Sequence, residues 1–228
     1  MKAGLMAMVL ASVAAFGQAP NAPSPASAPM RIYTNPELHL TFSYPAELTP
    51  RDAATVLAAE QRMIYGADAA TEGDPPRADK CAKVLLAVGE NGAGSGATTW
   101  ARVGLFDVDV RCLPAQALRN KKVMDTTLTK LVQQGTTEMG MMPIEPPMFY
   151  DLAGQRMHFS AAQGTPVTMS DLQTGEEQVI GAAAAAVNGH VLGWVLEAND
   201  AALFNRLLGS QVDFGGGKGQ RLFPARVQ

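Results

Sequence analysis

Cysteine is scarce in this chain, since only Cys81 and Cys112 occur among its 228 residues. Two thiols are too few for a disulfide-rich scaffold or for a zinc site made of four cysteines. The pattern Gly-x-Ser-x-Gly is missing as well, so a serine hydrolase with a nucleophile elbow has no candidate residue. These absences exclude a disulfide-rich scaffold, a four-cysteine zinc site and a serine hydrolase with a nucleophile elbow.

Positive charge is not in excess either. The chain has 18 Lys and Arg against 21 Asp and Glu, which gives a net charge of −3 at pH 7. A nucleic-acid-binding protein concentrates basic residues on one face or stripe, and here they are scattered. We therefore predict no nucleic-acid partner. After residue 16 no apolar run approaches the roughly 20 residues that span a bilayer, so we expect no membrane span in the mature chain.

The N-terminus has the pattern of a secretory signal peptide. Lys2 precedes the apolar run 4–16, and small residues follow it, as a cleavage site requires. We predict a signal peptide over residues 1–17 and a Pro/Ala-rich linker over 18–30, because proline and small residues cannot bury enough surface to fold. A single domain over 31–214 and a flexible tail over 215–228 complete the predicted organisation. The predicted compartment is extracytoplasmic, either the periplasm or the medium.

Alternating hydrophobic residues predict strands through much of the domain. In 38–44, Leu38, Leu40, Phe42 and Tyr44 share one face, so that face is expected to be buried. Pro45 is expected to end this strand, and Thr49 to cap a helix that runs to about residue 65. Further strands are predicted at 31–34, 82–90, 99–112, 148–152, 155–162, 178–187, 190–197 and 212–214, and further helices at 115–134 and 201–208.

Hairpins interrupted by only three helices predict an α+β fold, with a mainly antiparallel sheet and helices packed on its faces. The turn signal Asn188-Gly189 places the alanine run 182–186 in a strand, although alanine favours helices. The segment 136–147 is predicted to be irregular because Pro143, Pro146 and Pro147 interrupt it.

Three phrases carry a resemblance to a known family: "LTFSYPAEL", "LAGQRMHFSAA" and "NGHVLGWVLEANDAALFNRLLGSQVDF". In this order they resemble strand, corner and helix, then a glycine-turned hairpin, then a closing hairpin and capped helix of the PsbP-like (Mog1/PsbP/DcrB-type) α/β/α sandwich proteins. The resemblance covers roughly residues 31–214 in order of elements. It implies that fold and a non-enzymatic binding or assembly role, and it implies no ligand residues.

Residues suited to acid–base chemistry are few. His39, His158 and His190 each stand alone on a predicted strand, and we interpret each as a solvated strand histidine without a local acid–base partner. Asp107 and Asp109 lie two apart on one strand, with Cβ atoms roughly 7 Å apart. Such a pair suits a cation or acid–base work, but we interpret it as part of a solvated sheet face, where Asp usually lies. We expect no two of these five side chains to share a cleft.

Methionine is concentrated in one irregular stretch. Met139, Met141, Met142 and Met148 fall within ten residues, with His158 nearby in sequence. Soft thioethers select Cu(I), so Met139, Met141, Met142 and His158 form a candidate copper site. Methionine also fills gaps where a loop covers a core, and it serves adaptable partner surfaces. All three interpretations remain open at this stage.

The two cysteines are predicted to form a disulfide, because an exported chain with two thiols favours one. If strands 82–90 and 99–112 pair about a turn near Gly96, facing residue numbers sum to about 193, so Cys81 meets Cys112. A loop of this length suggests roughly 3–4 kcal/mol of stabilisation. The alternative is that both thiols are free and buried as small hydrophobic groups.

These observations predict an exported, monomeric, non-enzymatic binding or assembly module without a cofactor. Its partner is expected to be an envelope or extracellular protein, bound through sheet-edge loops and the segment 136–148. The alternative is a periplasmic copper-binding protein that uses the methionine-rich 139–148 segment. A hydrolase whose catalytic residues converge from distant strands is a third hypothesis, since such residues need no local motif.

Overall fold

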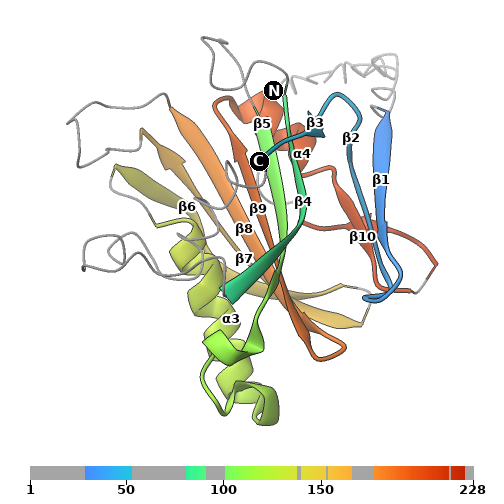
Figure 1. Cartoon of the computed structure of the whole chain (residues 1–228). Coiled ribbons are helices and arrows are strands. Elements are labelled where there is room, and N and C mark those ends of the chain that lie inside the picture. The colour runs from blue at the N-terminus through green and yellow to red at the C-terminus, as the bar shows by residue number, and fades with distance from the viewer. Residues whose placement is uncertain are drawn as a thin grey trace, which may run out of the picture.

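Two antiparallel sheets build the fold of this protein (Figure 1). The computed structural model describes residues 29–52, 81–90, 101–137, 140–152, 154–165, 177–215 and 217–223. The larger sheet has the order β3-β4-β5-β9-β8-β7-β6 and the smaller one β1-β2-β10-β11. The seven strands are β3 (Thr49–Pro50), β4 (Ala82–Gly89), β5 (Ala101–Val108), β6 (Met141–Leu152), β7 (Gln155–Gly164), β8 (Gln178–Val187) and β9 (His190–Ala198).

The smaller sheet consists of β1 (Met30–Asn35), β2 (Leu40–Pro45), β10 (Gln211–Asp213) and β11 (Gln220–Arg221). In the described ranges, the α-helices are α3 (Lys121–Gly135) and α4 (Ala201–Leu207), and two short 3-10 turns are η2 (Val110–Cys112) and η3 (Ala117–Arg119). No helix in these ranges is long and apolar enough to cross a membrane.

The predicted α+β fold class is wrong, because the described chain is β-rich and its strands form two sheets. Alternation along residues 38–44 correctly indicated a buried face: Leu40 and Phe42 are fully buried and Tyr44 nearly so. The alternation does not indicate which element covers that face. Here β2 shares one hydrophobic cluster with Phe159 and Trp194 of the larger sheet, so a second sheet takes much of the place assigned to helices.

Helix α3 covers the opposite face of the larger sheet, over β6, β7 and β8 (Figure 1). Its predicted apolar stripe, Met124, Leu128, Leu131 and Val132, is buried as expected. The stripe packs in a second cluster that includes alternate alanines of β8, Ala182 and Ala184. Small side chains let the helix approach the sheet closely. The prediction that the alanine run forms a strand under a helix is therefore confirmed.

The predicted β8–β9 turn and the predicted cap of α4 are both present in the structure. Asn188 and Gly189 both adopt left-handed φ angles, 51° and 85°, in the β8–β9 hairpin, as a two-residue turn of this type requires. Asp200 caps α4 by accepting a hydrogen bond from the amide of Leu203. The helix predicted to start at Thr49 is wrong at its first residues, because Thr49–Pro50 pairs with β4. The rest of that predicted helix from residue 53 onward, and residues 1–28, lie outside the described residues.

Two predicted boundaries need correction. The segment 136–147 was expected to be irregular, but β6 begins at Met141 and pairs with β7 through two register shifts. The flexible tail predicted over 215–228 does not hold for 217–223. There β11 pairs with β10, and Leu222 and Phe223 are buried in the cluster between the sheets. Phe223 packs edge-on against Phe159 at 5.0 Å between ring centroids, so apolar contact anchors this end of the domain.

Candidate functional site

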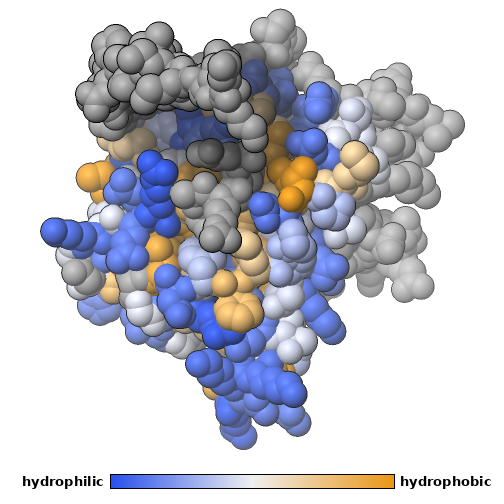
Figure 2. All heavy atoms as spheres, turned by 180° about the vertical axis from the view of Figure 1, so that it is seen from behind, coloured by the Kyte–Doolittle hydropathy of each residue, from blue (hydrophilic) through white to orange (hydrophobic). Residues whose placement is uncertain are grey.

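Strand β6 is the edge of the larger sheet and carries unusually exposed apolar side chains. Phe149 is 59% exposed, Met142 66% and Ile144 37%. Among the described residues, the other exposed large hydrophobic side chains are Met30, Ile32 and Leu118. The back view shows hydrophobic surface as separate patches between hydrophilic side chains (Figure 2). Half of these exposed apolar residues therefore lie on one edge strand.

The backbone of β6 is poorly suited to pairing with another strand. Pro143, Pro146 and Pro147 have no amide hydrogen, and the register with β7 shifts between Pro143 and Glu145 and again between Glu145 and Met148. Prolines and bulges on an edge strand block the addition of a further strand. The backbone of β6 is therefore protected against the addition of a further strand.

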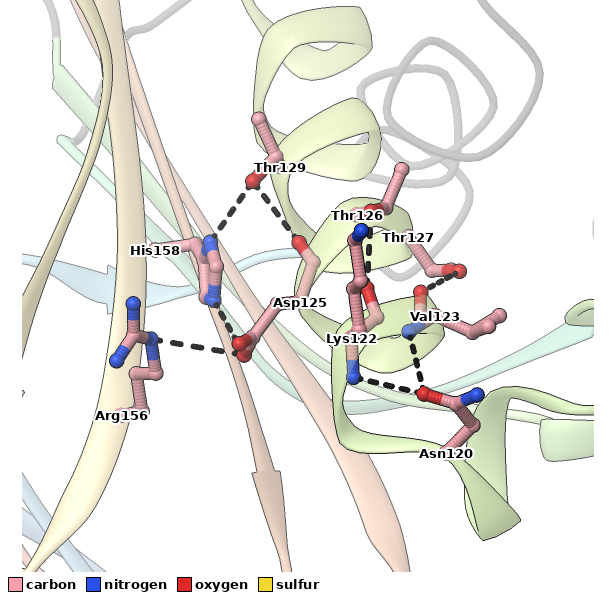
Figure 3. A network of polar contacts seen from close by, with 9 residues as sticks. All are labelled: Asn120, Lys122, Val123, Asp125, Thr126, Thr127, Thr129, Arg156 and His158. Atoms are coloured by element: carbon pink, nitrogen blue, oxygen red, sulfur yellow. Dashed lines mark hydrogen bonds and ion pairs between the residues drawn. The ribbon is translucent and has the colours of Figure 1, made fainter.

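Phe149 is held in place by a cation. The guanidinium carbon of Arg156, on β7, lies 3.6 Å from the centroid of the Phe149 ring. Arg156 Nε also lies 3.5 Å from Asp125 Oδ1 of α3. A cation–π contact at an exposed site contributes about 0.5–1 kcal/mol, and the carboxylate restricts the guanidinium further. The Arg156 guanidinium therefore contacts both the Phe149 ring and the Asp125 carboxylate, and the second contact is drawn in Figure 3.

His158 lies directly behind this pair, between α3 and the sheet, and is only 1% exposed. The prediction of a solvated histidine is therefore wrong. The even-numbered residues of β7 face α3, so their burial depends on the position of that helix. The alternating pattern of β7 does not predict where the helix lies. Burial lowers the pKa of His158, and Asp125 partly opposes this effect.

Both ring nitrogens of His158 have a polar neighbour on α3. Thr129 Oγ1 lies 3.1 Å from Nδ1 and 2.9 Å from the backbone oxygen of Asp125. Asp125 Oδ1 lies 3.5 Å from Nε2. These contacts hold the ring between β7 and α3 (Figure 3).

The proposed copper ligands are not brought together. Met141 packs inward against the cluster under α3, whereas its neighbour Met142 points outward. Met142 pairs with Gln163, and His158 lies five residues along the same strand, roughly 16 Å away by strand pitch. Met139 lies outside the described residues. Within those residues no group of three or more His, Cys, Asp or Glu is placed to hold a metal ion.

The acid–base candidates do meet, contrary to expectation. Asp107, Asp109 and His190 line one cleft of about 790 Å³, with Lys83 and Cys112 among the other lining residues. His190 Nδ1 lies 3.0 Å from Asp107 Oδ2. The prediction failed because β5 pairs with β9, which brings together residues 83 positions apart. Asp109 also caps η2, and its hydrogen bonds with Arg111 lower the pKa of its carboxyl group to about 2.

The predicted disulfide between Cys81 and Cys112 is confirmed, with a Cα–Cα distance of 5.7 Å, although the predicted register is not. Strands β4 and β5 pair with residue sums of 190 and 191 (82 + 108 and 86 + 105). The chain then leaves β5 and folds back through η2, and Asp109 N donates to the carbonyl of Cys81 at 2.6 Å. The short turn, rather than a direct cross-strand pair, brings Cys112 to Cys81.

Sequence reasoning missed the Phe149–Arg156–Asp125 arrangement, which joins β6, β7 and α3. The available signal was the hairpin at Gly154, since its register places residue 149 beside residue 158. The helix partner could not be inferred. The chain matches no protein-family model and no curated protein. Its function is therefore argued from the side chains that these three elements assemble.

Proposed function

We propose that this protein is an extracytoplasmic, non-enzymatic binding or assembly module that docks a partner protein through the β6 edge. The observation that carries this proposal is Phe149, which is 59% exposed yet fixed against Arg156. Aromatic residues and arginine are enriched at protein interfaces. Holding both in position before binding lowers the entropy lost on association.

The exposed side chains along the β6 edge indicate what kind of partner surface would fit it. Phe149 requires an apolar recess, and Met142 and Ile144 add apolar contacts elsewhere along the strand. Arg156 remains partly accessible, with its side chain 33% exposed, so a partner carboxylate beside the recess would complement its charge. The prolines of β6 exclude backbone pairing as the main mode of recognition. The partner is thus a folded protein surface rather than an added strand.

Export of the chain is part of the proposal. The Cys81–Cys112 disulfide suits an oxidising compartment, and the N-terminal sequence has the pattern of a signal peptide. The resemblance of short phrases to PsbP-like proteins points to the same kind of role, a binding or assembly function without catalysis, although the fold class it implied is not retained.

Site-directed crosslinking from the edge tests the proposal. A photo-crosslinking amino acid at Ile144 should capture one defined envelope protein, and Phe149→Ala should abolish the capture. The matched control is Ile32→Ala, because Ile32 is also exposed, at 69%, but lies on β1 of the smaller sheet. Loss of an interface anchor costs about 2 kcal/mol, or about 30-fold in Kd. Equal binding by the Phe149→Ala and Ile32→Ala variants would refute a role for this edge.

A further inference from the structure

The disulfide lies in the same cleft as a histidine–carboxylate pair. Cys112 is exposed and lines the cleft, whereas Cys81 is half-buried. Neither belongs to the two hydrophobic clusters that hold the sheets and α3 together. Exchange requires that an incoming thiolate can reach one sulfur of the disulfide. Cys112 is therefore the half of this disulfide that an incoming thiolate can reach.

His190 is arranged as a base in this cleft. A carboxylate oxygen only accepts hydrogen bonds, so the 3.0 Å contact between Asp107 Oδ2 and Nδ1 is a donation from the ring. The neutral imidazole therefore carries its lone pair on Nε2. The side chain is 44% exposed, so a ligand in the cleft can reach that nitrogen. A carboxylate that fixes the tautomer of a histidine in this way is a recurring feature of histidine bases.

The charges of the cleft do not repel an incoming thiolate. Arg111 forms an ion pair with Asp109, and Lys83 is the cross-strand neighbour of Asp107. Two cationic side chains thus offset two carboxylates in the same cleft. The volume, about 790 Å³, lies in the range of sites for small molecules. We infer that the Cys81–Cys112 disulfide exchanges with low-molecular-weight thiols in this cleft, with His190 as the base.

The exchange balances without a further reactant. His190 Nε2 accepts the proton of a thiol, and the thiolate sulfur attacks Cys112 Sγ. The bond between the cysteines breaks, and Cys81 leaves with the electron pair as a thiolate, which takes up a proton. A second thiolate then attacks the mixed disulfide at the sulfur of the first thiol. Two thiols are oxidised to one small disulfide, and the protein gains two electrons and two protons as two cysteine thiols.

Glutathione is the probe for the test, and the protein is the oxidised mature chain. Samples are quenched with acid at intervals, and free thiols are labelled and counted by mass spectrometry. We expect reduction of the native protein under conditions where circular dichroism shows it folded. His190→Gln, which keeps the disulfide, should slow the exchange at least about tenfold without changing the melting temperature. His39→Asn is the matched control, because His39 is an exposed turn residue with a left-handed φ of 51°, a conformation that asparagine tolerates.

A pair of cysteine variants tests which sulfur is attacked. When each variant is incubated with glutathione disulfide, Cys81→Ser should readily form a glutathione adduct on Cys112, with release of one glutathione thiol. Cys112→Ser should form the adduct on Cys81 much more slowly. Two results would overturn the inference. One is reduction that proceeds only at the rate of global unfolding. The other is an exchange rate in His190→Gln equal to that in His39→Asn. Neither readout depends on the β6 edge, so this test and the partner test fail independently.

Discussion

His158 Nε2 lies 3.5 Å from Asp125 Oδ1, across the contact between β7 and α3. Thr129 Oγ1, also on α3, lies 3.1 Å from the other ring nitrogen. His158 is buried, so protonating the ring places a charge between helix and sheet, where charge is poorly solvated. The pair links α3 to Arg156 and so to the exposed Phe149. Its protonation state therefore bears on the stability of the proposed binding edge.

Stability should fall as the solution is acidified through the titration range of His158. Burial lowers the pKa of His158 in the folded state, so the unfolded chain, with a pKa of about 6.5, binds the proton first. The contribution is fully present above about pH 6.5 and is lost as the pH falls below it, with a slope of at most about 1.4 kcal/mol per pH unit. Urea unfolding of the wild type and His158→Gln between pH 5 and 8 measures it. Parallel pH profiles of the two proteins would contradict the prediction.

Replacing Phe149 by alanine should leave the fold almost unchanged. The side chain is 59% exposed, so folding buries little of it, and the lost cation–π contact is worth about 0.5–1 kcal/mol. We expect a decrease in the free energy of unfolding of no more than about 1 kcal/mol. Thermal melting followed by circular dichroism provides the measurement. A larger decrease would mean that Phe149 serves the core and is unsuitable as a binding probe.

Gly181→Ala should destabilise the contact between α4 and the larger sheet. A Cβ atom at Gly181 would lie 2.9 Å from Cζ of Phe204 and 3.4 Å from Cε2 of Phe159. Both rings are buried and have little room to move, so we expect a loss of about 1–3 kcal/mol from overpacking. Chemical denaturation of the variant and the wild type measures the loss, and an unchanged free energy of unfolding would contradict the prediction.

The N-terminal cap of α3 should contribute measurably to stability. Asn120 Oδ1 accepts hydrogen bonds from the amides of Lys122 and Val123, at 3.0 and 3.3 Å. Asn120→Ala removes this acceptor and should cost about 1 kcal/mol. Asn120→Asp keeps an acceptor at the same place and adds a favourable charge at the helix N-terminus, so it should retain the wild-type stability. Equal destabilisation by both changes would show that the cap is not responsible.

Turns, caps and most strands followed from local sequence. Asn188-Gly189 requires left-handed backbone angles that few other pairs adopt readily, and Asp200 provides a cap that the following amides need. The two cysteines indicated their own pairing, since no other partner exists in the chain. These features depend on a few neighbouring residues or on counting, so they can be read without a structure.

The candidate sites could not be predicted from the local sequence. His190 and Asp107 lie far apart in sequence and meet because β5 pairs with β9. Phe149, Arg156 and Asp125 meet because α3 crosses the β6–β7 hairpin. Neither relationship leaves a periodic signal, since each depends on strand order and on which helix covers which face.

The sequence by itself determined the positions of the main strands, two helices, the hairpin turns and the disulfide, because backbone preference and alternation act over a few residues. Only the tertiary structure decided that a second sheet covers the inner face and that β6 is an exposed edge. It also decided that His158 is buried and that His190 reaches Asp107. These outcomes are contacts between distant segments, and each is selected by the burial of the whole chain rather than by its neighbours in sequence.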